Sequence, residues 1–196
     1  MGNLSFLCVD FQREFTSPSG KCFRRRPSVK FCKETFFPYL SRKKIKIAEI
    51  ISDYRRPRLC NEVEICIPGT EGFKSEVPED LRKSVWIKAM NSPVWRRKNA
   101  GKTLPTTHPY VDDKNFTDWI KKNLPYKNCI LFGLTLDRCI LATAMELYFR
   151  GWKVKILYEA VDTYSGRKKE KDMLVKNVPV LNWAEVIYWK NLKKEL

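Results

Sequence analysis

The sequence predicts an α/β protein built on a doubly wound, mainly parallel sheet with helices on both faces. Short apolar runs typical of buried strands recur along the chain. Segments with the apolar spacing of helices separate these runs. Several runs end on a polar residue, as buried strands do where they emerge from a sheet. The chain has 196 residues and is 43% hydrophobic, so we expect one domain that spans residues 1–196.

Three strands are predicted in the N-terminal half. The first, at residues 4–10, ends in Asp10, and the second, at residues 45–53, also ends in an acid. The third, at residues 84–89, carries Lys88 near its carboxyl end. A lysine in a buried run is costly unless it is paired, so Lys88 is expected to have a charged partner.

The segments between these strands predict loops and helices. We expect loops at residues 12–26 and 91–109, a chain reversal at residues 66–72, and helices at residues 29–40 and 113–123.

Residues 128–158 predict a strand, a helix and a second strand. The strands are expected at residues 129–132 and 154–158, and the helix between them ends at Gly151. This crossover normally makes the two strands parallel neighbours. Beyond it we expect a loop at residues 159–166, a charged helix at residues 167–177, an edge strand at residues 178–181, and a covering segment at residues 183–189.

Cys139 falls in the first turn of the helix in this unit. Unpaired backbone N–H groups and the positive end of the helix dipole favour a thiolate there, as a nucleophile requires. Most cysteines in apolar surroundings are inert small hydrophobes, however. The segment alone leaves both interpretations open.

Cysteine usage and the N-terminal residues indicate a cytoplasmic protein. The seven cysteines are an odd number and include no CxxC pair, which indicates reduced thiols. Residues 1–10 contain neither a basic segment followed by a long apolar stretch nor a membrane span. We therefore expect no membrane association.

The formal net charge is +16, and basic residues are concentrated between Lys21 and Arg58. That segment has thirteen basic and three acidic residues, enough to attract nucleic acid or another polyanion. No helix-turn-helix, zinc finger or RNP motif accompanies them. A solvated basic surface is the favoured interpretation, and nucleic-acid binding is kept as a secondary hypothesis.

Asp10, Lys88 and Cys139 are predicted to meet at one edge of the sheet. Each follows or closes a strand, and the carboxyl ends of parallel strands form the edge at which such sheets bind ligands. A thiol, an ammonium and a carboxylate at one edge are the groups that acyl transfer requires. Taken singly, each residue also has an ordinary structural explanation.

The chain resembles the isochorismatase-like cysteine hydrolases, which include nicotinamidases, N-carbamoylsarcosine amidases and isochorismatases. The matching segments are VDFQREF at residues 9–15, PGTEG at 68–72, VWIKA at 85–89, GLTLDRCILATAMELYFRGW at 133–152 and EAVD at 159–162. The resemblance implies a three-layer fold, a small-molecule substrate, and a homo-oligomer, either a dimer or a tetramer.

The resemblance also implies roles for individual residues. Cys139 would be the nucleophile, Asp10 the general acid and base, and Lys88 the residue that holds both in place. A cis peptide before Thr135 would turn the N–H groups of Thr135 and Cys139 towards an oxyanion. Phe15 would line the substrate pocket.

Metal-binding relatives carry an Asp-x-His motif and a further histidine, and this chain departs from that pattern. The corresponding stretch is residues 53–55, Asp-Tyr-Arg, the later position is Ile65, and the single histidine, His108, lies elsewhere. We therefore expect neither a metal nor another cofactor. Arg55 or Arg56 is expected to grip a substrate carboxylate, with an exposed surface arginine as the alternative.

The leading functional hypothesis is a metal-independent cysteine hydrolase that cleaves a small amide or ureido C–N bond through a thioester. Isochorismatase-type hydrolysis of an ether is the second choice within the same fold. The third is a basic polyanion-binding or nucleic-acid-binding protein with a vestigial catalytic rim.

Overall fold

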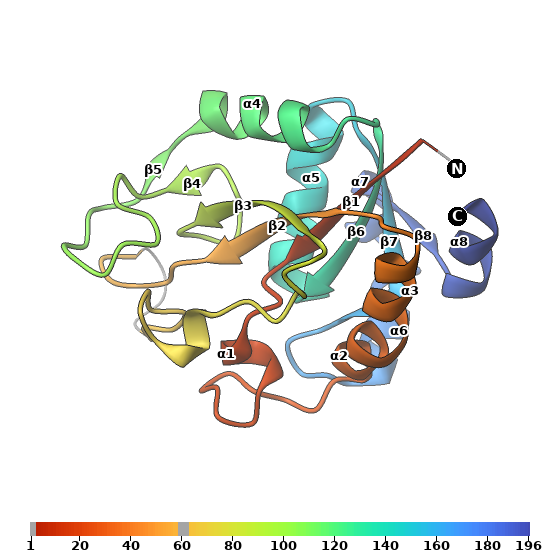
Figure 1. Cartoon of the computed structure of the whole chain (residues 1–196), viewed down its shortest axis with the longest axis horizontal. Helices are drawn as coiled ribbons and strands as arrows, with labels where there is room; N and C mark the ends of the chain where they lie inside the picture. The colour runs from red at the N-terminus through yellow and green to blue at the C-terminus, as the bar shows by residue number, and fades with distance from the viewer. Residues whose placement is uncertain (1–2, 59–62) are drawn as a thin grey trace.

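The computed structural model describes residues 3–58 and 63–196. Its centre is a six-stranded sheet in which every strand pair is parallel, in the order β3-β2-β1-β6-β7-β8 (Figure 1). The predicted α/β fold with a parallel sheet is confirmed. The strands are β1 (Leu4–Val9), β2 (Ile47–Ser52), β3 (Arg82–Lys88), β6 (Asn128–Leu134), β7 (Lys153–Asp162) and β8 (Glu185–Ile187).

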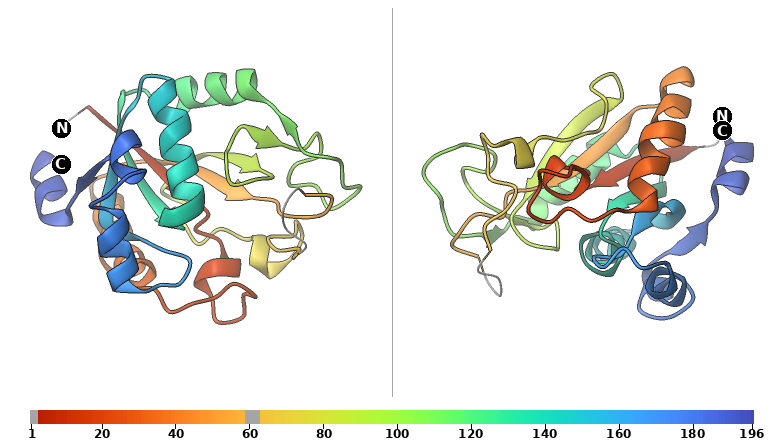
Figure 2. Two further views of the ribbon diagram at one scale, coloured as in Figure 1. Left: turned by 180° about the vertical axis from the view of Figure 1, so that it is seen from behind. Right: turned by 90° about the horizontal axis from the view of Figure 1, so that it is seen from below.

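Helices cover both faces of this sheet (Figures 1 and 2). On one face α4 (Asp113–Asn123) and α5 (Leu141–Phe149) lie side by side. The other face carries a continuous helical segment, and Trp189 of α8 packs edge-on against its rings. The segment comprises α2 (Pro27–Phe31), the π-helical turn η1 (Cys32–Phe36) and α3 (Phe37–Arg42). The remaining helices are α1 (Arg13–Thr16), the short 3-10 turn η2 (Glu71–Phe73), α6 (Lys168–Leu174), α7 (Val180–Trp183) and α8 (Trp189–Glu195).

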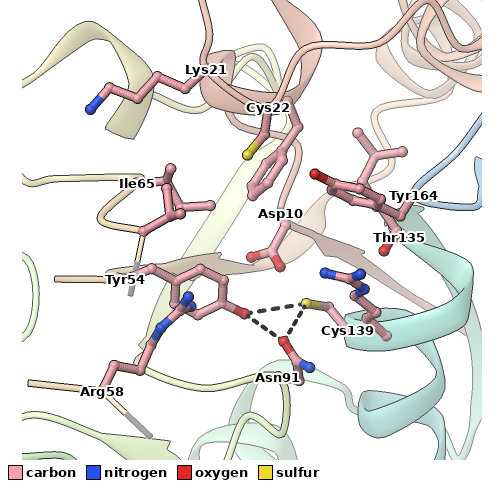
Figure 3. Close-up of a pocket in the computed structure, with 14 residues that line it drawn as sticks. Asp10, Lys21, Cys22, Tyr54, Arg58, Ile65, Asn91, Thr135, Cys139 and Tyr164 are labelled. Atoms are coloured by element: carbon pink, nitrogen blue, oxygen red, sulfur yellow. Dashed lines mark hydrogen bonds between the residues drawn. The ribbon is translucent and has the colours of Figure 1, made fainter. Parts of the chain in front are cut away.

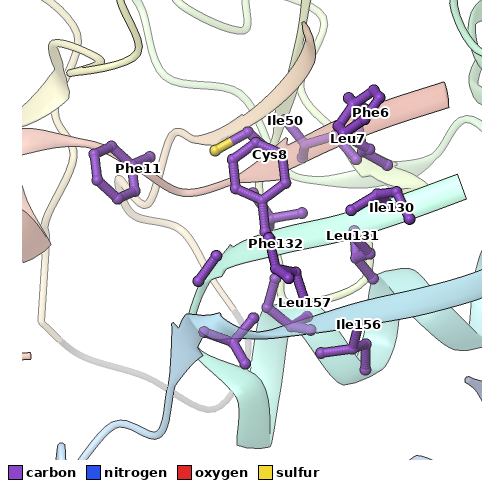
Figure 4. Close-up of a cluster of buried hydrophobic side chains, with 14 of the residues drawn as sticks. Phe6, Leu7, Cys8, Phe11, Ile50, Ile130, Leu131, Phe132, Ile156 and Leu157 are labelled. Atoms are coloured by element: carbon purple, nitrogen blue, oxygen red, sulfur yellow. The ribbon is translucent and has the colours of Figure 1, made fainter. Parts of the chain in front are cut away.

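The core lies on both faces of the central strands, since the apolar side chains of β1, β6 and β7 are almost completely buried (Figure 4). Strands buried on both faces read as continuous apolar runs, which is why these strands are visible in the sequence. The rings and branched side chains that meet here include Phe6, Leu7, Ile130, Leu131, Phe132, Ile156 and Leu157.

Gly133 allows the carboxyl ends of β1 and β6 to approach closely. It pairs with Val9, has a φ of 115°, and an added Cβ would lie 2.1 Å from the carbonyl oxygen of Val9. A side chain is excluded both by the backbone conformation and by the neighbouring strand. The glycine therefore brings the segment after β6 beside Asp10.

The edge strand predicted at residues 178–181 is wrong. Residues 180–183 form α7, and the edge strand β8 follows at Glu185–Ile187. Pro179 is the N-cap of α7, where its missing N–H leaves no helical hydrogen bond unmade. The predicted loop at residues 91–109 also contains β4 (Trp95–Arg96), which pairs with β5 (Tyr110–Val111).

Part of the basic segment is internal. Arg26 is buried and donates hydrogen bonds to the carbonyl oxygens of Phe15, Thr163 and Tyr164. Arg55 is also buried. These two arginines stabilise the fold and cannot contribute to a surface for polyanions. Across the described ranges, none of the helices has the length and apolar character that crossing a membrane requires.

Candidate active site

Four neighbouring strands bring polar side chains to one edge of the sheet. Asp10 follows β1, Ser52 closes β2, and Lys88 closes β3. Cys139 lies in the π-helical turn η3 (Leu136–Ile140) that follows β6. One edge of the sheet therefore holds Asp10, Lys88 and Cys139, which agrees with the expectation from the sequence.

Lys88 lies at the centre of this cluster and is completely buried. Its Nζ lies 2.9 Å from Oδ2 of Asp10 and 3.4 Å from Sγ of Cys139. It also donates hydrogen bonds to Oγ of Ser52 at 2.7 Å and to the hydroxyl of Tyr54 at 2.5 Å. Burial lowers the pKa of Lys88, but Asp10, Cys139 and Tyr54 outweigh burial and raise the pKa well above its ordinary value. Lys88 is therefore a permanent cation.

Asp10 is held in an unusual backbone conformation. Its φ is 52°, in the left-handed region that aspartate adopts more readily than most residues. Ser52 donates a hydrogen bond to Oδ1 at 2.7 Å, and the buried Oδ2 forms an ion pair with the Lys88 ammonium at 2.9 Å. A carboxylate oxygen has two lone pairs, so Oδ2 can accept a proton while it remains beside Lys88.

The sulfur of Cys139 has two further polar neighbours, Tyr54 and Asn91 (Figure 3). The Tyr54 hydroxyl lies 3.3 Å from Sγ, and the Asn91 side-chain oxygen accepts from the thiol at 3.6 Å. Burial, followed by the charge of Cys139, raises the pKa of Tyr54 well above its usual value. Tyr54 therefore keeps its proton and can donate it in a hydrogen bond to the sulfur.

The thiol of Cys139 is not acidic at rest, contrary to the sequence-based expectation. Burial raises its pKa to about 11, although Lys88 and the hydrogen bond from Tyr54 lower it. The carboxylate of Asp10 raises it further. Desolvation of the buried thiol is a larger effect here than the charge at the start of the helix. A nucleophilic sulfur at this position requires a base.

The turn before Cys139 contains the expected cis peptide, which joins Leu134 to Thr135. Thr135 is the N-cap of η3, and its carbonyl oxygen accepts hydrogen bonds from the N–H groups of Arg138 and Ile140. The first N–H groups of a helix have no partner within the helix. Thr135 directly precedes η3, and Cys139 is the fourth residue of this turn.

A cavity of about 290 Å³ opens over the sulfur. Phe15 lines it, as expected from the sequence, together with Asp10, Thr135 and Cys139. A cavity of this size accommodates a small organic molecule. Its other lining residues are Lys21, Cys22, Tyr54, Arg58, Val63, Ile65, Asn91, Leu134, Arg138 and Tyr164.

Arg55 does not reach this cavity, so the structure corrects its expected contact with substrate. Its Nε and Nη2 donate to the two carboxylate oxygens of Asp53 at 2.8 and 2.7 Å, and its Nη1 donates to the carbonyl of Thr103. A buried bidentate pair satisfies the guanidinium within the protein. Arg56 does not line the cavity either.

The residues where metal-binding relatives hold their ion do not fit a metal. The carboxylate of Asp53 already accepts two hydrogen bonds from Arg55 and one from the N–H of Gly101. Ile65 offers no donor atom, and a guanidinium cannot ligate a cation. Among the residues described, no group of three or more His, Cys, Asp or Glu side chains is placed to hold a metal.

Ser52, Tyr54, Asn91 and Arg58 are the site residues that the sequence analysis missed. Ser52 and Tyr54 flank Asp53 at the end of β2, and only the acid was considered there. The end of a predicted strand was the available signal for both residues. Asn91 and Arg58 lie in irregular segments, where the sequence contains no signal of side-chain direction.

Comparison with solved structures shows that proteins described as a pyrazinamidase, a nicotinamidase and an N-carbamoylsarcosine amidase have a similar fold. Pyrazinamidase of Pyrococcus horikoshii in complex with zinc is 18% identical with a TM-score of 0.66, and the match covers 95% of this chain and 99% of that one. Nicotinamidase from Bacillus subtilis is 15% identical with a TM-score of 0.66, covering 93% and 98%. N-carbamoylsarcosine amidase from Thermoplasma acidophilum is 18% identical with a TM-score of 0.63, covering 94% and 95%.

At these identities the likeness establishes the fold. No protein-family model matches the sequence, and no curated protein matches it.

Proposed function

We propose that the protein is a cysteine hydrolase that cleaves a small amide or ureido C–N bond through a thioester on Cys139. The observation that carries this proposal is the contact of one buried ammonium, Lys88, with both the carboxylate of Asp10 and the sulfur of Cys139. The solved structures of like fold include two amidases and a nicotinamidase, which supports an amide as the substrate.

In the first half of the reaction the sulfur attacks the carbonyl carbon of the substrate. Oδ2 of Asp10 accepts the thiol proton as the C–S bond forms, which removes the need for a resting thiolate. Lys88 and the Tyr54 hydroxyl stabilise the charge that develops on sulfur. The backbone N–H groups of Thr135 and Cys139 are proposed to bind the oxyanion.

Collapse of this intermediate breaks the C–N bond. Asp10 returns the proton to the leaving nitrogen, so ammonia or an amine departs and a thioester remains. In the second half Asp10 accepts a proton from a water molecule that attacks the thioester. The C–S bond then breaks, Asp10 returns this proton to the departing sulfur, and the carboxylic or carbamic acid leaves with the thiol restored.

A hydrolysis screen with a matched variant tests this function. The parent and Cys139→Ala proteins are incubated with a panel of small amides, ureido compounds and vinyl ethers, and released ammonia, amine or alcohol is measured. We expect the parent to hydrolyse at least one amide or ureido compound, and the variant to hydrolyse none. Turnover of amides by both proteins contradicts the proposal, and turnover of vinyl ethers alone favours isochorismatase-type chemistry.

A further inference from the structure

Arg58, one of the cations that line the cavity, has two N–H donor groups that contact no acceptor among the described residues. Its Nε and Nη2 are buried and have no hydrogen-bond partner among the described residues. Its guanidinium lies over the ring of Tyr54, with Cζ 4.1 Å from the ring centroid (Figure 3). Stacking on a ring fixes the plane of the guanidinium and leaves its edge free to bind a ligand.

The guanidinium of Arg55 shows which chemical group such a pair of N–H donors binds in this protein. In Arg55 the same two nitrogens, Nε and Nη2, donate to the two oxygens of the Asp53 carboxylate. Two parallel N–H donors match the spacing of two carboxylate oxygens. In Arg58 the equivalent pair of donors has no acceptor within the described ranges, although Arg58 lines the cavity and Arg55 does not.

Among the described residues, no carboxylate forms an ion pair with Arg58. Burial lowers the pKa of Arg58, and the groups that offset part of this effect are the phenol of Tyr54 and the thiols of Cys139, Cys66 and Cys22. The acid that lines the cavity, Asp10, is already paired with Lys88. A half-buried cation that has no acid beside it in the described part of the chain is stabilised when an anion binds.

We propose that Arg58 is a carboxylate-binding residue and that the substrate is an anionic amide or ureido compound. The ureido or amide part of this inference rests on the proposed function, whereas the carboxylate part rests on Arg58. The Tyr54 ring links the two sites, because Arg58 stacks on its face and its hydroxyl contacts the sulfur. A substrate whose carboxylate lies a few bonds from the reacting carbonyl spans them, which is compatible with a cavity of about 290 Å³.

Cys139 itself reports on this site through two alkylating reagents that differ in charge. N-iodoacetylglycine carries a carboxylate, and N-iodoacetylglycinamide is its neutral counterpart. In both, the sulfur displaces iodide and forms a thioether, so no hydrolysis is needed. The rate at Cys139 is followed by peptide mass spectrometry in the parent, in Arg58→Gln, and in Arg24→Gln. Arg24 is exposed and does not line the cavity, so its variant controls for the loss of one charge.

We expect the parent to react at least about tenfold faster with the anionic reagent, and the rate to saturate with its concentration. Arg58→Gln should lose this preference, and Arg24→Gln should keep it. Arg58→Lys should keep part of this preference, because lysine keeps the positive charge but lacks the two parallel N–H donors of the guanidinium. Equal rates for both reagents in the parent, or a preference that survives in Arg58→Gln, overturn the proposal.

A measurement on the parent alone guards against a variant that does not fold. Propionate should slow the alkylation of Cys139 by iodoacetamide, and propionamide at the same concentration should not. Equal protection by both compounds, or none by propionate, counts against the carboxylate site. A preference for the anionic reagent together with no hydrolysis of any amide would refute the proposed function and leave the carboxylate site standing.

Discussion

Lys88 reaches Asp10 across an intervening strand. The two residues close β3 and follow β1, and β2 lies between these strands, yet Nζ and Oδ2 are 2.9 Å apart. Ser52, at the end of β2, fills the space between them by accepting a hydrogen bond from Lys88 and donating one to Asp10. A small hydroxyl at this position allows the long lysine side chain to pass, so three adjacent strands contribute to one charge cluster.

Lys88→Met should lose both stability and activity. The variant leaves the buried carboxylate of Asp10 without its counter-ion, a loss of about 3–5 kcal/mol in the free energy of unfolding. Loss of the ammonium beside the sulfur should lower the rate of hydrolysis about 10²–10⁴-fold. The double variant Asp10→Asn/Lys88→Met is the control, because it removes both charges and should regain stability without activity. A single variant as stable as the parent, measured by urea denaturation, would show that the pair is not buried as described.

Tyr54→Phe should make the thiol of Cys139 less acidic. The hydrogen bond from Tyr54 lowers the pKa of Cys139, so its loss should move the pH profile of alkylation by iodoacetamide to higher pH. At a fixed pH below 11 the rate should fall about tenfold, which is typical for a hydrogen bond to a charged group. Tyr148→Phe, on the exposed part of α5, controls for loss of a hydroxyl. An unchanged pH profile would remove Tyr54 from the reaction.

Gly133→Ala should destabilise the protein by about 2–5 kcal/mol, because the new methyl group meets the carbonyl of Val9 and the backbone has a positive φ. Gly151→Ala is the matched control. Gly151 also has a positive φ, of 80°, but no atom lies within 4 Å of an added Cβ. This variant should lose only about 1 kcal/mol. Equal losses in thermal or urea unfolding would mean that β1 and β6 are not in close contact at this point.

The buried carboxyl group of Glu49 should lower the free energy of unfolding as the pH rises. Burial raises its pKa from 4.5 to about 7, and the hydrogen bond from Ser75 offsets only part of this. Between these two pH values the unfolded chain has lost the proton while the folded protein retains it, so stability falls as pH rises and levels off above 7. The contribution is at most about 3 kcal/mol. In urea denaturation at pH 5 and pH 8, Glu49→Gln should be more stable than the parent at pH 8, and a parent advantage at pH 8 would contradict this account.

The sequence was sufficient to place Asp10, Lys88 and Cys139 together because each closes or follows a strand that the sequence predicts. Parallel strands bring such positions to one edge whatever the connecting loops do. The sequence was not sufficient to place the side chains of Arg55 and Arg58, which are three residues apart in a basic segment. One is buried against Asp53 and the other lines the cavity, and which is which depends on the path of an irregular segment. The pKa of Cys139 also depends on burial, which helical position alone does not give.

The most direct test of the central claim is to trap the acyl group on Cys139. The protein is quenched with acid while it turns over an amide, digested, and examined by peptide mass spectrometry. We expect the peptide that contains Cys139 to gain the mass of the acyl group, and hydroxylamine to remove it, as it does from a thioester. Steady turnover with an unmodified Cys139, or an acyl group on another residue, would contradict the account.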